Sequence, residues 1–385
     1  MNIVLGITGS IAAYKALELI RLFRKEGAEV RVVLTESAQH FVTPLSCQTL
    51  SGAEVYLEQF VLTRGIKHLS LAEWGDILVI APATANILGK ASSGIGDDLL
   101  STAVLSFTKP VLFVPAMDSG MWENPIVQKN VKILKDAGFH FLEPGVGPLA
   151  SGKSGKGRFP HISFIHKKIL ALTAGYQGLG GRRFLISGGR TEEDIDPVRV
   201  VTNRSSGKMA KELMYAVICR GGEARGVFGG VSIPLPEGLS ITRVRISAEM
   251  LAALKKDVKW CDCLIMSAAV GDYRPVSSSP KKIHDERLKI SMKKNRDILK
   301  ELKKYKGGGC FIGFSLEDRE QLKYGRRKLH EKGLDFIVLN SSKAIADDRI
   351  DARILKKDGS VVKCTGLSKW ELANKILDEY IKEFN

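Results

Sequence analysis

The sequence predicts two α/β domains in tandem, each built on a parallel sheet that helices cover. Short apolar runs alternate with helix-like segments along most of the 385 residues, and the glycine-rich stretch GYQGLGGRR separates two such series. A chain of this length suffices for two domains that each bury a core. We therefore expect one α/β domain in residues 1–175 and a second in residues 176–385.

In the first domain, strand-like and helix-like runs follow one another at the spacing of βαβ units. We expect strands in IVLGIT, EVRVVLT, DILVIAPAT and PVLFVPAM, and helices in AAYKALELIRLFRKEG, NPIVQKNVKILKDAG and ISFIHKKILALTA. Strands joined in this way form a parallel sheet with helices on both faces, which makes the domain doubly wound. Residues 143–158 are rich in glycine and proline, so we expect a loop or flap there.

The second domain repeats this alternation and then changes pattern. We expect strands in RRFLISGG, EARGVFGG, CDCLIMSAAVGDY, CFIGFSLE and DFIVLNSS, and helices in SSGKMAKELMYAVICRGG and QLKYGRRKLHEKG. The stretch RILKKDGSVVK predicts a hairpin that turns at Asp358 and Gly359. A closing helix is expected in SKWELANKILDEYIKEF.

The composition is that of an ordinary globular protein, with 44% hydrophobic and 26% charged residues. No apolar stretch approaches the roughly 18 residues that a membrane helix needs, so we expect no membrane span. The N-terminal MNIVLGITGS has no basic region before its apolar run, and we interpret it as a first strand of a cytoplasmic protein. Six scattered cysteines without CxxC spacing indicate reduced, buried thiols.

The net charge of +16 raises the question of a nucleic-acid partner. Lys and Arg outnumber Asp and Glu by 17 to 14 up to residue 180, which leaves 41 against 28 for the rest of the chain. The excess is therefore C-terminal, where we find no nucleic-acid module. A polyphosphate substrate and a solvated basic surface account for it better, and we expect no nucleic acid.

Small polar residues follow the first two strands of the first domain. Gly9 and Ser10 follow IVLGIT, and Thr35 and Ser37 follow EVRVVLT. Two such termini side by side favour a phosphate site, although serine and threonine are also ordinary helix caps. A GxGxxG spacing is absent, which argues against a conventional dinucleotide site.

Two titratable residues of the first domain stand out. His68 is able to change charge near neutral pH, although a lone histidine is more often structural. Asp118, in FVPAMDSGMW, follows a strand-like run directly. Its place at a strand end raises the question of what an anion does there.

The second domain offers polar residues for a nucleotide. Four residues at the start of the first helix favour a phosphate, although the GxxxxGK[ST] spacing of a P-loop is absent: Ser205, Ser206, Gly207 and Lys208. Asp272 ends a strand and suits a metal or a ribose. Lys328 and Lys332, four apart on one helix face, suit a polyphosphate, the alternative being a solvated surface.

Several segments of the first domain resemble the flavin-containing cysteine decarboxylases. They occur in the family's order across residues 1–170: ITGSIAAYK, FVTPLS, KHLSLAEW, APATANILGKASSGIGDDLLST, PAMDSGMW and LASGKSGKGR. The resemblance implies a flavodoxin-like fold, a homo-oligomer with trimeric flavin domains, and bound FMN. In that family FMN oxidises the substrate, carbon dioxide leaves, and the resulting enethiol is reduced.

The resemblance also implies roles for single residues. It assigns the FMN phosphate and ribityl chain to Gly9, Ser10, Thr35 and Ser37. It assigns the flavin ring or its neighbouring subunit to Thr84, Asn86, Ser101, Thr102 and Met117. His68 falls at the position of the family's catalytic histidine.

Two positions depart from the family pattern. Asp118 stands where asparagine is usual, and Ser151 stands where the proton-donating cysteine is usual. A serine hydroxyl is a far weaker acid than a thiol. Two anions about 4 Å apart repel by roughly 4 kcal/mol at an effective dielectric constant near 20, so we expect Asp118 or the substrate carboxylate to be protonated, paired or displaced. Three outcomes remain open for this site: full decarboxylation, a reaction that stops at the enethiol, or no activity.

The second domain resembles phosphopantothenate–cysteine ligase over about residues 182–380. The similar segments, in family order, are DPVRVVTNRSSGKM, SAAVGDYRP, the lysines before Ile283, GFSLE and KLHEKGLDFIVLN. The resemblance implies a Rossmann-like, dimeric domain that uses CTP and Mg²⁺. In that family CTP activates the carboxylate of 4′-phosphopantothenate as an acyl-cytidylate, and the amine of cysteine then displaces CMP.

By position, Asn203 matches the asparagine that holds the acyl-cytidylate, and Arg199 matches the arginine beside it. The resemblance assigns CTP and its metal to Asp272, Lys282, Phe314, Lys328 and Lys332. It also implies a catalytic role for Lys282, as for Asn203. The departures in this domain are GGRTEED, GDY and KKNRDIL, which places Arg296 where proline is usual.

Together the two resemblances predict a bifunctional enzyme of coenzyme A biosynthesis, a ligase followed by a decarboxylase. Its expected partners are 4′-phosphopantothenate, cysteine and CTP, in a homo-oligomer of trimeric flavin and dimeric ligase domains, a dodecamer if both contacts form. The alternatives are a ligase with an oligomerising flavin scaffold, and a flavin-binding regulatory protein.

Overall fold

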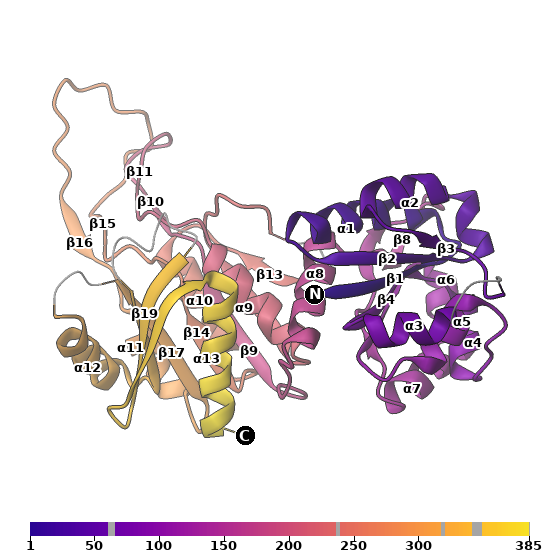
Figure 1. The fold of residues 1–385 in the computed structure, drawn as a ribbon. Coiled ribbons are helices and arrows are strands. Elements are labelled where there is room, and N and C mark those ends of the chain that lie inside the picture. Colours follow the sequence, from indigo (N-terminus) through magenta and orange to yellow (C-terminus); the bar gives the residue numbers. More distant parts are fainter. Residues whose placement is uncertain (61–65, 236–238, 317–319, 341–348, 385) are drawn as a thin grey trace. The chain divides into compact units, whose positions relative to one another are not determined.

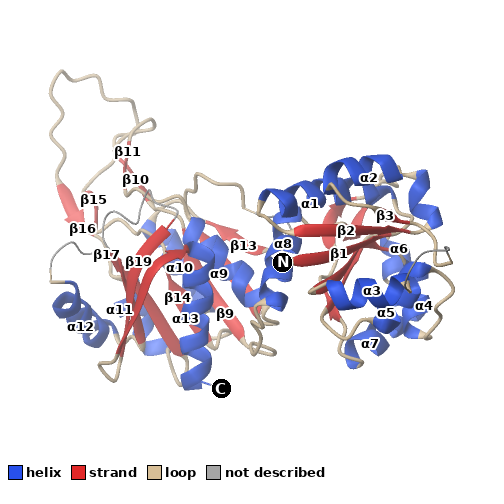
Figure 2. Ribbon diagram, in the orientation of Figure 1, coloured by secondary structure: helices blue, strands red, loops and turns tan. Residues whose placement is uncertain are grey.

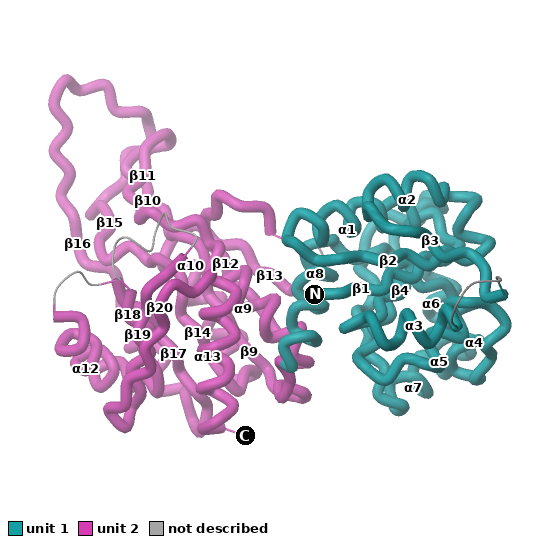
Figure 3. The backbone as a smooth tube through the Cα atoms, in the orientation of Figure 1, with its two compact units in different colours: residues 1–175 teal, residues 176–385 magenta. Residues whose placement is uncertain are grey.

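The chain forms two α/β units, Met1–Gly175 and Tyr176–Asn385, which Figure 3 colours separately. The computed structural model describes residues 1–60, 66–235, 239–316, 320–340 and 349–384. Glu317, Ser341 and Ser342, at the ends of two expected strands, lie outside the described residues.

The first unit contains a six-stranded parallel sheet of order β3-β2-β1-β4-β5-β6. Its strands are β1 (Asn2–Ile7), β2 (Glu29–Leu34), β3 (Val55–Tyr56), β4 (Ile77–Ala83), β5 (Val111–Pro115) and β6 (His140–Phe141). Apart from the two-residue edge strand β3, this is the strand order of flavodoxin-like folds. The expected doubly wound sheet is therefore confirmed, and its order reverses between β1 and β4.

Helices cover both faces of this sheet (Figure 2). One core lies beneath α1 (Tyr14–Lys25), α2 (Pro44–Ser51) and α8 (Ile162–Thr173). The other lies beneath α3 (Lys67–Trp74), α4 (Ala85–Ser92), α5 (Leu99–Ser106) and α7 (Pro125–Asp136). The short helix α6 (Ser119–Trp122) follows β5. The central strands β1 and β4 are buried on both faces, which explains why they are continuous apolar runs in the sequence.

The expected flap is a β-hairpin rather than an irregular loop. Strand β7 (Gly145–Pro148) pairs antiparallel with β8 (Ser154–Arg158). The N–H of Met117 donates to the carbonyl of Gly157 at 3.1 Å, which attaches the hairpin to the chain just after β5. Lys135 and Lys156 both pair with Glu143 at its base. The hairpin thus lies against the carboxyl end of the sheet.

The second unit contains an eight-stranded sheet of order β13-β12-β9-β14-β17-β18-β19-β20. Its strands are β9 (Arg183–Gly188), β12 (Glu223–Phe228), β13 (Ser240–Arg243), β14 (Cys263–Met266), β17 (Cys310–Leu316), β18 (Phe336–Asn340), β19 (Arg349–Lys356) and β20 (Val361–Ser368). The first six are parallel in the Rossmann order, and β19 and β20 form the expected hairpin. The strand order reverses between β9 and β14.

Helices α9 (Lys208–Cys219) and α13 (Lys369–Phe384) pack together on one face of this sheet. The other face is covered by α10 (Ser247–Asp257), α11 (Ile298–Leu302) and α12 (Gln321–Lys332). Helix α9 begins later than expected. Gly207, in a left-handed conformation with φ of 79°, is its N-cap, and Ser205 and Ser206 precede the helix.

Two small ladders project from the second unit and form an arm that the strand pattern did not predict (Figure 1). Strand β10 (Glu192–Asp194) pairs with β11 (Val200–Thr202), and β15 (Tyr273–Pro275) pairs with β16 (Met292–Lys294). Residues 276–291 connect β15 to β16 and extend from the body of the unit. We call β10, β11, β15, β16 and the connections within each pair the arm.

Two global expectations are tested by the described residues. None of their helices combines the length and the apolar character needed to cross a membrane. All six cysteines are free thiols, and only Cys261 is not fully buried. Burial raises the pKa of the Cys47 thiol to about 11, which keeps it protonated.

Candidate active sites

The carboxyl ends of β1, β2 and β4 meet where the first sheet reverses its order. The Thr8 hydroxyl donates to the carbonyl of Pro82 at 2.8 Å and accepts from the N–H of Thr84 at 3.1 Å. Gly9 lies so close to Ser37 that an added Cβ would be 2.5 Å from the Ser37 Cβ. These contacts hold the polar ends of three strands together, as a crevice at a switch point requires.

A cavity of about 470 Å³ opens beside these strand ends. Of the residues singled out in the sequence, it is lined by Ser10, Met117, Asp118 and Ser151. The sequence analysis missed Lys15 and Arg158, which also line it. The cavity therefore brings the loop after β1, the end of β5 and the flap hairpin to one place.

Asp118 and Ser151 contact each other inside this cavity. The Ser151 hydroxyl donates to Asp118 Oδ2 at 2.7 Å, and the N–H of Gly120 donates to Asp118 Oδ1 at 3.0 Å. These two hydrogen bonds, helped by the charge of Lys153, lower the pKa of Asp118. The lowered pKa favours an ionised Asp118 that Ser151 and Gly120 hydrogen-bond, and it argues against a protonated Asp118.

The other residues singled out in the first unit lie outside the cavity. Ser101 is buried and completes a capping box with Asp98 at the start of α5. The Thr102 hydroxyl donates to the carbonyl of Asp98 at 2.8 Å. Six further residues do not line the cavity: Gly9, Thr35, Ser37, Thr84, Asn86 and His68. His68 is half-buried on α3.

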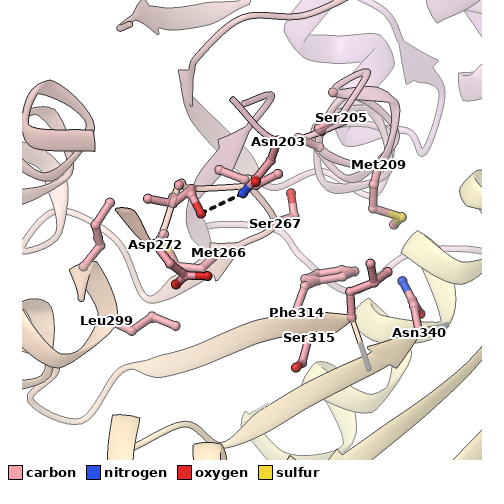
Figure 4. A pocket seen from close by; sticks show the side chains of 18 of the residues that line it. Asn203, Ser205, Met209, Met266, Ser267, Asp272, Leu299, Phe314, Ser315 and Asn340 are labelled. Atoms are coloured by element: carbon pink, nitrogen blue, oxygen red, sulfur yellow. Dashed lines mark hydrogen bonds between the residues drawn. The ribbon is translucent and has the colours of Figure 1, made fainter. Parts of the chain in front are cut away.

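A cavity of about 640 Å³ lies at the carboxyl ends of β9, β14 and β17 in the second unit (Figure 4). It brings together most of the residues singled out there: Asn203, Ser205, Ser206, Gly207, Lys208, Asp272, Phe314, Lys328 and Lys332. These residues come from the loop before α9, the loop after β14, strand β17 and helix α12. Lys328 and Lys332, four residues apart on one face of α12, therefore line the same cavity.

Three contacts orient side chains in this cavity. The amide of Asn203 donates to the carbonyl of Val270 at 3.0 Å, the bond drawn in Figure 4. Lys328 Nζ donates to the Ser315 hydroxyl at 2.9 Å. Lys332 Nζ lies 3.0 Å from Asp297 Oδ2. Burial alone would raise the pKa of Asp297, but Lys332 holds it below its usual range.

The sequence analysis missed several residues of this cavity. Asn295 and Asp297 lie in the KKNRDIL segment between β16 and α11, and Asn340 ends β18. Within the described residues, the buried Oδ1 atoms of Asn295 and Asn340 have no hydrogen-bond partner. Asp297 caps α11. A polar segment directly before a helix N-terminus is the sequence signal that would have identified it.

Arg199 and Lys282 do not line the cavity. Arg199 lies in the turn between β10 and β11, where its guanidinium is 2.7 Å from Asp196. Lys282 is exposed in the connection between β15 and β16. Both residues therefore belong to the arm.

Two α/β units, each with a polar cavity at its switch point, define the architecture of an enzyme with two active sites. The flavoprotein family model matches residues 1–174, and the model of the DNA/pantothenate metabolism flavoprotein C-terminal domain matches residues 179–384.

The chain is also similar to curated proteins along its full length. It is 38% identical to the coenzyme A biosynthesis bifunctional protein CoaBC of Bacillus subtilis, with 98% of this chain and 96% of that protein covered. It is 36% identical to the Haemophilus influenzae protein of the same name, with 100% and 98% covered. A crystal structure of the C-terminal domain of a CoaBC protein is 33% identical, covers 53% of this chain and 96% of its own, and has a TM-score of 0.47.

The chain therefore belongs to the CoaBC family of bifunctional coenzyme A biosynthesis proteins. Like that family, it is an enzyme with a ligase and a decarboxylase activity.

The Ser151–Asp118 hydrogen bond predicts how the flap responds to pH. The pKa of Asp118 is below the ordinary aspartate value of 3.8, so the bond is present above that pH and is lost as the pH falls through the lowered pKa. Hydrogen exchange of residues 145–158, corrected for intrinsic rates, should be constant from about pH 5 to pH 9 and should rise only in more acidic solution.

Ser151→Ala should raise this exchange at every pH above 3.8, because the bond to Asp118 is gone. Ser154→Ala, an exposed position on the same hairpin, is the matched control and should leave the exchange unchanged. A loss of protection centred near neutral pH would show that another group holds the flap.

Proposed function

We propose that the second unit joins 4′-phosphopantothenate to cysteine with CTP, and that the first unit decarboxylates the product with FMN to 4′-phosphopantetheine. The observation that carries this proposal is the 640 Å³ cavity, in which an amide, a carboxylate and two helix lysines converge at the switch point of a Rossmann-like sheet. Such a crevice suits a nucleotide whose phosphates are held by cations.

The ligase residues have separate tasks. A carboxylate is a poor electrophile, so CTP converts it to an acyl-cytidylate with release of pyrophosphate. Lys328 and Lys332 offset the negative charge that moves onto the pyrophosphate. Asn203, held by the Val270 carbonyl, presents its amide to the acyl-cytidylate while the cysteine amine attacks and CMP leaves. The residues at the start of α9 line the same cavity, and a helix N-terminus suits a phosphate.

The cavity also fits Mg²⁺ bound together with the triphosphate. Asp272 and Asp297 line it, whereas no group of three or more metal-binding side chains occurs among the described residues. This agrees with the usual Mg²⁺ site, in which one or two carboxylates act with substrate phosphates. When bound, the ion supplies positive charge next to the phosphates. We propose Asp272 as its protein ligand.

The strand ends of the first unit fit the phosphate and ribityl chain of FMN. The close approach of Gly9 to Ser37 leaves the hydroxyls of Ser10, Thr35 and Ser37 around one edge of the sheet, and a side chain at position 9 would fill that space. When bound, FMN supplies a two-electron acceptor and donor beside the thiol-bearing carbon of the substrate.

The remaining cofactor and catalytic assignments rest on the family resemblance. They are a flavin ring or subunit contact at Thr84, Asn86, Ser101, Thr102 and Met117, and a catalytic role for His68.

The substrate carboxylate needs a cation, because Asp118 is ionised. Lys15 and Arg158 line the same cavity and balance that charge. The Ser151 hydroxyl already donates a hydrogen bond to Asp118, and a hydroxyl is a weak acid, so we assign Ser151 to holding the flap rather than to protonating the product.

A second candidate function follows from the same pair of residues. If no other group supplies the proton that Ser151 withholds, the first unit stops at the enethiol or acts as a scaffold, and the chain works as a ligase. The observation that favours this alternative is the hydrogen bond from Ser151 to Asp118, which engages the Ser151 hydroxyl and lowers the pKa of Asp118.

We propose a homo-oligomer in the cytoplasm, without nucleic-acid or membrane partners. The arm exposes apolar side chains that a second copy would cover, and this supports a dimer of the second unit: Val198, Tyr273, Val276, Leu288 and Met292.

The first unit exposes Phe60 and Leu45, at 88% and 73%, which supports a separate contact and the trimer. Six free thiols support a reducing compartment.

Supplying 4′-phosphopantothenate, cysteine, CTP and Mg²⁺ tests the proposal, with product masses as the readout. We expect 4′-phosphopantetheine. Accumulated 4′-phosphopantothenoylcysteine would leave only the ligase, and unchanged substrates would contradict both activities.

Asn203→Asp should lower cysteine ligation by at least roughly a hundredfold, because a carboxylate near the acyl-cytidylate phosphate replaces a donor with a like charge. Amide formation, followed by mass, is the measurement. Decarboxylation of supplied 4′-phosphopantothenoylcysteine by the same chain is the control and should not change. Ligation at the wild-type rate would contradict the placement of Asn203.

Lys332→Ala should raise the KM for CTP roughly ten- to a hundredfold, the usual effect of losing one charge-assisted hydrogen bond. Lys323→Ala is the matched control, because Lys323 lies on the same helix, is exposed and pairs with Glu320 outside the cavity. Equal effects of the two substitutions on CTP would contradict a specific role for Lys332.

A further inference from the structure

Asp196 is a buried carboxylate that lines neither cavity. It lies in the turn between β10 and β11 and is 1% exposed. Its Oδ1 atom accepts from the N–H of Val198 at 2.8 Å and from the N–H of Arg199 at 2.7 Å. Its Oδ2 atom accepts from the Arg199 guanidinium at 2.7 Å. These three bonds all lie within the turn and are sufficient to stabilise it.

One further bond leaves the turn. Asp196 Oδ2 also accepts from the backbone N–H of Ile283, 87 residues away, at 3.2 Å. The Arg199 guanidinium donates to the carbonyl of the same residue at 3.0 Å. Asp196 and Arg199 therefore hold both backbone groups of Ile283. We call these three residues the clamp.

The residue before Ile283 is Lys282, and two more bonds steady this stretch of the arm. The N–H of Ser279 donates to the carbonyl of Ile195 at 2.9 Å, and the Ser279 hydroxyl donates to the carbonyl of Lys281 at 2.6 Å. The stretch from 279 to 283 is thus fixed to the turn between β10 and β11. The Lys282 side chain itself is exposed.

The clamp keeps its charge over the working pH range. Burial alone would raise the pKa of Asp196, but three backbone N–H groups and the Arg199 guanidinium lower it to about 2. A buried carboxylate is tolerated only when its acceptor sites are filled, as they are here. Replacing it with a neutral side chain removes the charge from every one of these bonds.

We propose that Asp196 is a positioning residue of the ligase, which holds Lys282 in place through the backbone of Ile283. The inference rests on the proposed ligase function and on the catalytic role that the family resemblance assigns to Lys282. An exposed lysine on a long connection has many orientations, and a charge assists a reaction only when it is held within about an ångström of its place. The clamp supplies that restraint at the residue next to Lys282.

Asp196→Asn is the first test. It should lower the kcat of ligation about ten- to a hundredfold, the usual effect of misplacing a catalytic group. The KM for CTP should stay within about twofold, because Asp196 does not touch the nucleotide cavity. Asp194→Asn is the matched control: Asp194 lies on β10, pairs with Arg245 and has no bond to the 279–283 stretch. It should leave both constants unchanged.

A double-mutant cycle with Lys282→Ala separates positioning from general support of the fold. If Asp196 acts through Lys282, the double variant should be no slower than Lys282→Ala alone, within about twofold. Rates that multiply would overturn the proposal, as would an Asp196→Asn variant with the wild-type kcat.

Two measurements distinguish the loss of positioning from misfolding of the variant. Decarboxylation of supplied 4′-phosphopantothenoylcysteine and calorimetric binding of CTP should be unchanged in Asp196→Asn. If CTP binding is lost, Ile283→Pro replaces it in the cycle. Proline removes the N–H that Asp196 Oδ2 accepts and leaves the bonds within the turn between β10 and β11 in place, while it also fixes φ at residue 283 and restricts the backbone of Lys282. Additive effects of Ile283→Pro and Lys282→Ala would also overturn the proposal. A wild-type chain that forms no amide would instead refute the ligase function itself.

Discussion

Both active sites depend on the way parallel strands end at one edge of a sheet. Where the strand order reverses, neighbouring loops diverge and leave a crevice lined by strand ends and helix N-termini. The first unit has this reversal between β1 and β4, and the second has it between β9 and β14. Each cavity lies beside its reversal, so the sheet decides where chemistry takes place before any single side chain is considered.

The two crevices differ because the loops around them carry different charges. In the second unit Lys328, Lys332 and the start of α9 create a cationic wall, and Asp297 balances one of its lysines. In the first unit an ionised carboxylate, Asp118, stands at the end of β5 and is held by the flap. The same architecture thus presents a cationic cavity in one unit and a cavity with a carboxylate in the other, which agrees with the triphosphate and flavin sites that we propose.

The main strands and the longest helices were predictable, because strands buried on both faces require continuous apolar runs and surface helices require an apolar stripe. The shorter helices, α2 to α6, α10 and α11, were not among the expected elements. The arm was not predicted, since β10, β11, β15 and β16 have three residues each, which is too short for a periodicity to be detected. The flap was predicted as irregular because its glycines hide strand propensity. Backbone pairing with its own second strand and with Met117 orders it instead.

The sequence alone determined the two-domain order, the main strands of each sheet and the residue types that resemble a flavin decarboxylase and a CTP-dependent ligase. Only the tertiary structure decided which of these residues meet. It paired Asp118 with Ser151 across 33 positions and Asp196 with Ile283 across 87, and it placed Lys282 on an arm outside the cavity of the second unit. Hydrogen bonds act over about 3 Å, and the distances between loops follow from long-range packing that no local pattern encodes.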